Sequence, residues 1–408
     1  MENPVFLWCE KGLILTNPRI LYFVPEAPLS QAQYVYSQVL APACYLSRNG
    51  FECMFIGSDV SDKIAAEAQK NISRCYGIQS KVCGCYSNKI SFLSHALTVR
   101  RVFWQTKQII RDFKPTHIYT RGFFSPSLAR KIAKRYNAIH VHDVRGMAAE
   151  EWVLMGGKKG LQYFFLSKID LAEIRKADRL SCVSTGLKNW IKKKTNRDDV
   201  TVIPCCTDVD KFLAYNTYRD EIRKHYNIAD EEKVICYLGG LCKWQRIADI
   251  INLFLAVSKI HAGFKFLFIT PHPDQLKEMI RNAGLPLNAC ISINCSYEDV
   301  PRYLMAADAG IIMRDSVLAN KVACPIKIGE YLACGLPVIL TKGIGDFDAI
   351  INQAGIGILV GDNVQAAQQV VNFMQAPAFS QLRNKAVEFC KKYLAIESYL
   401  DEYRTLFR

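Results

Sequence analysis

Short apolar runs alternate with longer amphipathic stretches along almost the whole chain, and this alternation restricts the possible folds more than any other feature. A short apolar run between turn residues predicts a buried strand, whereas apolar residues three or four positions apart predict a helix. Strands that alternate with helices form parallel sheets, and the connecting helices cover both faces. The sequence therefore predicts an α/β protein.

The alternation pauses after Pro204 and begins again at Lys233, which divides the chain into two parts. The expected strands are 20–24, 52–56, 117–120, 138–141, 179–183 and 200–203, then 233–238, 264–269, 290–294, 309–313 and 338–340. The expected helices are 30–47, 91–113, 125–136, 185–194, 247–260, 325–334 and 381–407. We expect two doubly wound, Rossmann-like domains, 1–208 and 209–391, with a C-terminal helix, 392–408, that packs back on the first. Ligands of such sheets bind beyond the carboxyl ends of the strands, so two facing domains would enclose a cleft.

Positive charge is concentrated in the first half of the chain. The formal net charge is +14, and residues 1–210 carry 30 Lys and Arg against 18 Asp and Glu, which leaves 22 against 20 for the rest. This asymmetry suggests that the first domain meets an acidic partner. The basic residues of the expected helix 91–113 have two possible roles. They form the solvated face of a helix packed on the core, or they dock on anionic lipid head groups.

The sixteen cysteines contain no CxxC pair, and many of them lie in apolar runs, where a thiol behaves as a small apolar side chain. This usage predicts neither a disulfide framework nor a zinc site, and it suits a reducing compartment. Glu10 and Lys11 interrupt the apolar patch near the N-terminus, so we expect no secretory signal there. No apolar run is long enough to span a membrane. We expect a cytoplasmic protein, either soluble or peripheral on the inner face of the membrane.

The segment PIKIGEYLACGLPVIL, over 325–340, is the most informative about function. It predicts a helix that ends at Gly335, followed by a turn and a buried strand. Pro325 suits the first turn of a helix, and the free N–H groups and positive dipole end there favour an anion such as a diphosphate. Lys327 adds a charge in the same turn, and Glu330 can accept hydrogen bonds from a pair of sugar hydroxyls. From spacing alone, an ordinary surface helix with scattered charges is the alternative.

This segment resembles the donor-site signature of the retaining family 4 glycosyltransferases of the GT-B fold, in which Pro-x-Lys-x-x-Glu-Tyr-Leu-Ala-x-Gly-x-Pro-Val-Ile recurs. The resemblance extends over most of the chain, through the segments 142–146, 183–185, 202–212, 307–311, 343–345 and 354–360. In the family, the last of these is a short hairpin. The resemblance implies two Rossmann-like domains facing a cleft. It also implies a hexosyltransferase that moves a sugar from a nucleotide-sugar donor to a saccharide or polyprenyl-diphosphate-linked acceptor in polysaccharide or glycolipid synthesis.

The resemblance also implies residue roles. Glu330 would bind the donor ribose, and Arg314, Lys243 and Lys327 are candidates for the donor phosphates. The donor site implied in full is Gly240, Lys243, Arg246, Arg314, Pro325, Lys327, Glu330, Tyr331 and Gly345. On the acceptor side, His142, Asp143 and Arg145 are the catalytic candidates, and a purely structural His–Asp pair is the alternative. Fixed N–H dipoles and basic side chains would stabilise the leaving diphosphate without a covalent nucleophile. We expect no metal and no cofactor other than the donor itself.

Three places depart from the family pattern. Val322 stands where many members have a first glutamate, eight positions before Glu330. The loop 239–246 lacks the usual basic residue after its glycine, so we expect Lys243 or Arg246 to replace it. The loop 25–31 lacks a glycine pair, which makes its contribution to diphosphate binding doubtful.

Some alternatives stay open from the sequence. Arg121 and Arg145 either face a pyrophosphate or pair with Asp143 and Glu150. A sugar-nucleotide epimerase or hydrolase would use the same donor pocket, but His142 or Asp143 would act on a water molecule. The charge alone also suggests a nucleic-acid-binding protein, but the sequence has no helix-turn-helix, zinc or RNA-binding signature, so we expect no nucleic-acid partner.

Overall fold

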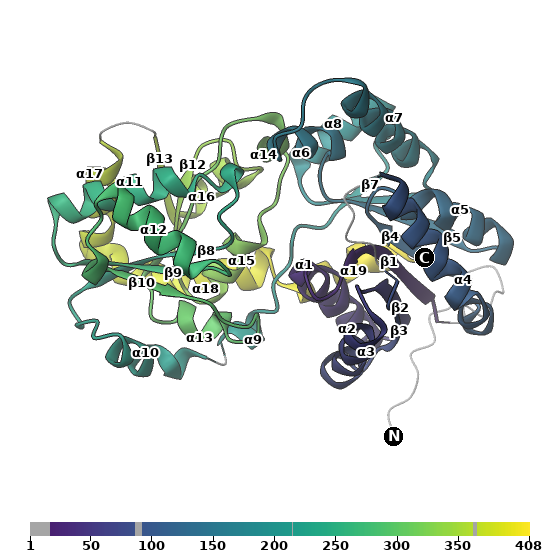
Figure 1. The fold of residues 1–408 in the computed structure, drawn as a ribbon, viewed down its shortest axis with the longest axis horizontal. Coiled ribbons are helices and arrows are strands. Elements are labelled where there is room, and N and C mark those ends of the chain that lie inside the picture. The colour runs from purple at the N-terminus through teal and green to yellow at the C-terminus, as the bar shows by residue number, and fades with distance from the viewer. Residues whose placement is uncertain (1–16, 86–91, 214, 362–364) are drawn as a thin grey trace.

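The structure is a computed structural model that describes residues 17–85, 92–213, 215–361 and 365–408. Two α/β units lie side by side in it, each built on one parallel sheet (Figure 1). This arrangement confirms the predicted fold class. In the described part of the chain, no helix is long and apolar enough to cross a membrane.

The first sheet has the strand order β3-β2-β1-β4-β5-β6-β7. Its strands are β1 (Arg19–Pro28), β2 (Glu52–Ser58), β3 (Gln79–Cys83), β4 (His117–Arg121), β5 (Ile139–Val144), β6 (Arg179–Cys182) and β7 (Val200–Val202). The helices of this unit are α1 (Gln33–Val35), a π-helical turn (Tyr36–Leu40), α2 (Ala41–Arg48), α3 (Asp62–Tyr76), α4 (Phe92–Phe113), α5 (Ser125–Tyr136), α6 (Ala148–Leu154), α7 (Leu161–Lys176) and α8 (Thr185–Thr195).

The second sheet has the order β10-β9-β8-β11-β12-β13. Its strands are β8 (Lys233–Leu238), β9 (Phe264–Ile269), β10 (Cys290–Ile293), β11 (Ala309–Ile312), β12 (Val338–Thr341) and β13 (Gly357–Val360). The helices after β7 are α9 (Val209–Leu213), α10 (Arg219–His225), α11 (Ile247–Ile260), α12 (Pro273–Ala283), α13 (Val300–Leu304), α14 (Leu318–Lys321), α15 (Ile326–Ala333), α16 (Phe347–Ala354), α17 (Ala366–Gln375), α18 (Leu382–Tyr393) and α19 (Leu400–Leu406).

Successive residues of the central strands point to opposite faces of their sheets, and both faces are buried. In β1, Ile20 and Tyr22 belong to the core that α19 closes, whereas Leu21 and Phe23 belong to the core under α4 and α5. The strand β8 divides its side chains between two cores in the same way. The continuous apolar runs of the sequence therefore correspond to strands covered by helices on both sides.

The C-terminal segment returns from the second unit to the first (Figure 1). The helix α18 packs on α15, and the chain then passes beside the linker, where the Thr207 N–H donates to the Leu394 carbonyl at 2.7 Å. The helix α19 packs on β6 and β7, and Phe407 is buried in the core beside Ile20. The chain thus crosses between the units twice, at neighbouring places.

The structure differs in several details from the predictions made from the sequence. The helix expected over 30–47 contains a π-helical turn, and the strand expected over 138–141 continues to Val144. The expected hairpin over 354–360 is wrong, because β13 pairs in parallel with β12 and α16 connects them. The sequence did not predict α3, α12 or the edge strand β3. The first residue of the helix expected over 91–113, Ser91, lies outside the described residues.

Replacing Phe407 by alanine tests the role of the C-terminal segment. Phe407 is 1% exposed, and its ring contacts the edges of Phe51 and His117. Removing a buried aromatic ring typically lowers the free energy of unfolding by about 3–5 kcal/mol. We expect Phe407→Ala to show a loss of this size in urea unfolding, whereas Phe164→Ala, at a half-exposed ring on α7, changes it little. Equal effects of the two substitutions would contradict the packing described.

Candidate active site

A cavity of about 750 Å³ lies between the two units. In the first unit its walls come from the carboxyl ends of β1, β4 and β5, and in the second from the end of β11 and the segment 319–326. The order of the first sheet reverses between β1 and β4, and that of the second between β8 and β11. Open parallel sheets bind ligands at such points. This cavity, called the cleft below, is the candidate active site.

The helix α15 begins at the cleft. Pro325 is the residue before its first turn, and it lines the cleft together with Ile326. As a proline, Pro325 offers no side-chain acceptor to the N–H groups of that turn. These groups and the positive end of the helix dipole are therefore available to an anion.

Lys327 lies under the loop that follows β8. Its Nζ is 5.7 Å from the centre of the Tyr237 ring. A Cβ atom on Gly239 would lie 2.1 Å from this Nζ, and Gly239 has a φ of +148°, so the loop needs glycine here. Burial and the nearby charge of Arg314 lower the pKa of Lys327 to about 8, against the opposing effect of Glu330. A buried cation beside an uncapped helix end favours an anionic ligand.

Arg314 follows β11 and lines the same end of the cleft. Its guanidinium stacks on Trp244, with 4.7 Å between the guanidinium carbon and the ring centre. The side chain is 8% exposed, and its Nε has no hydrogen-bond partner among the described residues. Burial lowers the pKa of Arg314 to about 10. Sequence reasoning missed Trp244, although it stands in the loop that departs from the family pattern.

Glu330 lies one turn into α15 and is 3% exposed. Burial raises the pKa of its carboxyl to about 7, against the opposing charge of Lys327. The phenol of Tyr297 lies beside this carboxyl and influences its pKa, and it also interacts with Ser37 in the first unit. The contact of these three residues therefore joins the two units beside α15.

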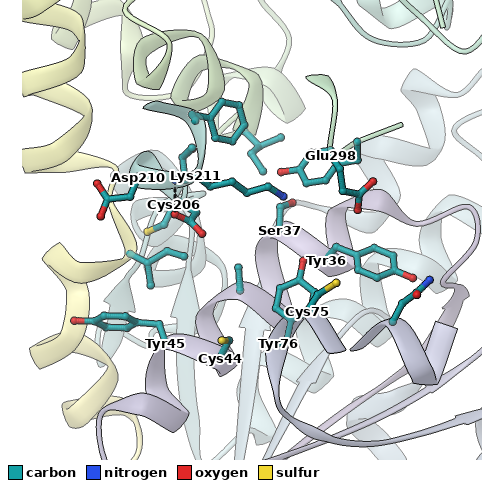
Figure 2. A pocket seen from close by; sticks show the side chains of 18 of the residues that line it. Tyr36, Ser37, Cys44, Tyr45, Cys75, Tyr76, Cys206, Asp210, Lys211 and Glu298 are labelled. Atoms are coloured by element: carbon teal, nitrogen blue, oxygen red, sulfur yellow. Dashed lines mark hydrogen bonds between the residues drawn. The ribbon is translucent and has the colours of Figure 1, made fainter. Parts of the chain in front are cut away.

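A second cavity, of about 930 Å³, adjoins this contact and shares Ile326 with the cleft. Figure 2 shows Lys211 extending across it toward Ser37, above the rings of Tyr36 and Tyr76. Because Glu330 lies near the boundary between the cavities, a ligand that reaches from Pro325 to Glu330 would extend from the cleft toward the second cavity.

Asp143, on the first-unit side of the cleft, accepts hydrogen bonds from three side chains. Its carboxylate accepts from the phenol of Tyr119 at 2.5 Å, from Oγ of Ser181 at 2.8 Å and from the guanidinium of Arg145. Burial alone would raise the pKa of Asp143, but Arg145, Arg121 and the phenol outweigh it, so the pKa is lowered. The carboxylate is therefore ionised, and it holds Arg145 in place.

His142 precedes this aspartate within β5 and lines the cleft at 2% exposure. Burial lowers its pKa to about 4, so the ring is neutral at physiological pH. Its Nδ1 has no hydrogen-bond partner among the described residues. The ring stacks on His140, with centroids 6.2 Å apart. A neutral imidazole can accept a hydrogen bond from a hydroxyl, provided that local rearrangement gives access to it.

Glu26 lies within β1, in the segment 25–31 that lacks a glycine pair. Its carboxylate accepts from the N–H groups of Phe123 and Phe124 at 2.7 and 2.8 Å, and from the backbone and hydroxyl of Ser125. These groups begin α5, so the chain supplies its own anion at this helix end. The sequence did not predict this arrangement.

Arg121 and Arg145 differ in their partners. Arg145 pairs with Asp143, whereas Arg121 forms no ion pair within the described residues. The guanidinium of Arg121 stacks on the Tyr34 ring at 4.7 Å, and its Nη1 has no hydrogen-bond partner there. Glu150, the other partner considered, accepts a hydrogen bond from Tyr163. Arg121 therefore brings an unpaired positive charge to the first-unit wall of the cleft.

Of the nine predicted donor residues, Arg314 and Pro325 line the cleft and the other seven do not. Lys243 is exposed and lines neither cavity, whereas Arg246 pairs with carboxylates of its own unit, at 2.7 Å from Asp249. Tyr331 is in the core, and its hydroxyl accepts from the Leu238 N–H at 2.8 Å.

The two predicted glycines have backbone roles. The carbonyl of Gly240 accepts from the Tyr237 hydroxyl at 2.5 Å. Gly345 has a φ of +53°, and a Cβ there would lie 1.9 Å from the carbonyl oxygen of Ala323, which lines the cleft. Glycine at 345 therefore lets its loop approach the wall of the cleft.

Two family models match the chain, one for each unit. The model of "Glycosyltransferase Family 4" matches residues 38–211, and that of "Glycosyl transferases group 1" matches residues 218–392. Together they cover most of the chain, and the matched ranges meet between α9 and α10.

Curated relatives match at low identity. The chain is 22% identical over 242 residues to N-acetyl-alpha-D-glucosaminyl L-malate synthase of Bacillus anthracis, covering 57% of this chain and 60% of that protein. It is 22% identical over 241 residues to the putative colanic acid biosynthesis glycosyl transferase WcaI of Escherichia coli, covering 58% of each. The match thus spans about three fifths of the length of these relatives.

Solved structures share the fold. Sucrose-phosphate synthase from Thermosynechococcus elongatus superposes with a TM-score of 0.70 at 16% identity, over 96% of this chain and 99% of that one. Anabaena Alr3699/HepE in complex with UDP-glucose gives a TM-score of 0.70 at 13% identity, over 95% and 99%. At such identities the likeness concerns the GT-B fold.

Replacing Glu330 by glutamine tests its burial. Its folded-state pKa of about 7 lies above the ordinary 4.5, so between these values the folded protein binds more protons than the unfolded chain. The stability contributed by Glu330 is therefore lost as the pH rises through this window, by up to about 3 kcal/mol.

We expect the free energy of unfolding of the parent, relative to that of Glu330→Gln, to fall between pH 5 and pH 8 in urea titrations. A matched substitution of the exposed Glu278 would leave the difference independent of pH. If the free energy of unfolding had the same pH dependence in the parent and in Glu330→Gln, this carboxyl would be hydrated and not buried.

Proposed function

We propose that this chain, which belongs to the group 1 and family 4 glycosyltransferases of the GT-B fold, transfers a sugar from a nucleotide-sugar donor to a saccharide or lipid-linked acceptor. The observation that carries this proposal is the amino end of α15, which opens on the cleft beside Arg314 and Lys327. Its N–H groups and the two cations match the charge of a nucleoside diphosphate. Solved structures of Anabaena Alr3699/HepE, which has the same fold, hold UDP and UDP-glucose and support a donor of this class.

The donor would lie along α15. Its diphosphate would meet the N–H groups after Pro325, and its ribose hydroxyls would hydrogen-bond to Glu330, one turn further on. The phenol of Tyr297 lies beside this carboxyl, so the ribose would take its place. The sugar would then extend into the cleft toward His142 and Arg145.

We propose that transfer proceeds with retention. The acceptor hydroxyl would attack on the face from which the diphosphate leaves, and an oxygen of that diphosphate would take the proton. Negative charge grows on the leaving group, and fixed N–H dipoles and buried cations stabilise it without reorganising. The unpartnered Nε of Arg314 is a donor suited to this charge. Asp143 acts as a positioning residue because its carboxylate is occupied by Tyr119, Ser181 and Arg145.

The acceptor side favours an acceptor with an anionic group, such as a polyprenyl diphosphate. Arg121 brings an unpaired charge to this wall, and the name of one relative includes L-malate, which is also an anion. Apolar side chains beside lysines on the outer surface of this unit support docking at an anionic membrane. Lys107 lies over the ring of Trp104, which is 63% exposed, and Lys168 lies over the half-exposed Phe164.

A thermal-shift panel of UDP, GDP, ADP and CMP sugars tests the donor proposal. Ligand binding stabilises the folded state by mass action, so we expect one nucleotide class to raise Tm and the others not to. Glu330→Ala should abolish that shift while the variant stays folded, and Glu278→Ala, at an exposed carboxylate of α12, should keep it. An undiminished shift in Glu330→Ala would refute the assignment.

The same preparation distinguishes transfer from the alternative activity. Stoichiometric release of free sugar or of an epimer from the labelled donor, without any acceptor, would favour a hydrolase or epimerase.

Substituting Arg121 tests the acceptor proposal. A hydrogen bond to a charged group contributes about 1.5–3 kcal/mol, so Arg121→Gln should reduce transfer to a polyprenyl-diphosphate acceptor by roughly 10- to 150-fold. The donor-induced Tm shift should persist, since the proposed contacts of the diphosphate and ribose lie on the second unit. Arg135→Gln removes the same charge from an exposed position of α5 and serves as the control. Equal transfer rates in all three proteins would exclude Arg121 from acceptor binding.

A further inference from the structure

Two cysteines that are far apart in the sequence meet at the cleft. Cys205 lies in the linker after β7, and Cys324 immediately precedes Pro325. The backbone N–H of Cys205 donates to Sγ of Cys324 at 3.2 Å, so the two residues are in direct contact. Both residues are half-buried and line the cleft. The pair therefore connects the linker with the start of the helix α15.

The surroundings make the two thiols unequal. Nη1 of Arg145 donates to Sγ of Cys205 at 3.7 Å. The neighbouring Cys324 side chain and the charges of Arg145 and Arg121 outweigh burial and lower the pKa of Cys205 to about 6, whereas the pKa of Cys324 is raised. Cys205 is thus the more acidic thiol of the pair, and it ionises first, beside the protonated thiol of Cys324. By contrast, burial raises the pKa of the adjacent Cys206.

A thiolate next to a second thiol is the arrangement of an oxidant-sensitive cysteine and its resolving partner. We propose that Cys205 and Cys324 form a reversible modification site in the cleft, which peroxide converts to a disulfide. In the first step, the sulfur of Cys205 attacks a peroxide oxygen, the O–O bond breaks, and hydroxide leaves as the sulfenic acid forms. In the second, the sulfur of Cys324 attacks that of Cys205, the S–O bond breaks, and the oxygen leaves as water. Peroxide is reduced and the two cysteines are oxidised by two electrons in total.

The disulfide would change the site at two points. It would tie the linker covalently to the residue before Pro325, and so restrict how far the units can separate at the cleft. It would also remove the thiolate that Arg145 now contacts. We therefore expect the disulfide to prevent donor binding. This consequence rests on the proposed function, whereas the formation of the disulfide does not.

Peptide mapping of the full chain tests the site itself. The protein would be treated with hydrogen peroxide, blocked with N-ethylmaleimide and digested without reductant. We expect a linked peptide pair joining Cys205 to Cys324, lighter than the two free peptides by two hydrogens, which dithiothreitol separates. Cys324→Ser should leave a sulfenic acid on Cys205 that dimedone traps, and Cys205→Ser should give neither product. Cys290→Ser, at a half-buried cysteine away from the cleft, should form the disulfide as the parent does.

Two results would overturn the modification site. One is the absence of the linked pair at peroxide concentrations that already oxidise the exposed Cys75. The other is alkylation of Cys205 in the reduced protein at no higher rate than that of Cys75 at pH 7.

The donor-induced Tm shift tests the consequence separately. Oxidised protein should lose the shift given by the nucleotide sugar to which the reduced protein responds, and dithiothreitol should restore it. A mapped disulfide with an unchanged shift would overturn the block on donor binding but not the site. If the reduced protein responds to no nucleotide sugar, the proposed function fails, while the peptide map still decides the disulfide.

Discussion

The hydroxyl of Tyr331 fixes α15 to the two strands between which the order of the second sheet reverses. It accepts from the N–H of Leu238 at the end of β8 and donates to the carbonyl of Ile311 in β11. The ring covers Gly310, where a Cβ would lie 2.3 Å from it, so the helix can lie this close only over glycine. Because Pro325, Lys327 and Glu330 belong to the same short helix, this contact sets their positions relative to the cleft. Tyr331 thus supports the candidate site by fixing α15 to the sheet.

The cleft combines buried cations of two kinds. Arg145 has a carboxylate partner in Asp143, and the charge of this pair is balanced within the protein. Arg314 has no carboxylate partner within ion-pair distance among the described residues, and aromatic stacking on Trp244 compensates only part of the lost hydration. A buried charge without an ion-pair partner is unfavourable, and a bound diphosphate would offset this cost. The charge distribution therefore favours an anionic ligand on the second-unit side.

The fold class and the start of α15 could be predicted because their signals are local. Buried strands such as β8 are continuous apolar runs, and Pro325, Lys327 and Glu330 stand within six residues. The edge strand β3 begins Gln79, Ser80 and Lys81, so it offers no such run. A hairpin was expected in place of the parallel strand β13 because the resemblance to the family implied one there.

The missed parts of the site depend on contacts between distant segments. Trp244 meets Arg314, Glu26 meets the start of α5, and Cys205 meets Cys324, each across many intervening residues. No periodicity or spacing in one sequence encodes such pairs. Lys243 and Arg246 were chosen because they stand in the right loop, but the loop directs one to solvent and the other to Asp249.

The double crossing of the chain has a consequence for recombining enzymes of this kind. Residues after Ala395 complete the core of the first unit, although they follow the whole second unit in the sequence. A chimaera made by joining the first half of this chain to the second half of a homologue would bring a foreign α19 to the groove that Phe407 fills. The segment best suited to exchange between homologues is therefore an internal one. It is bounded by the linker and by the β-bridge between Thr207 and Ala395.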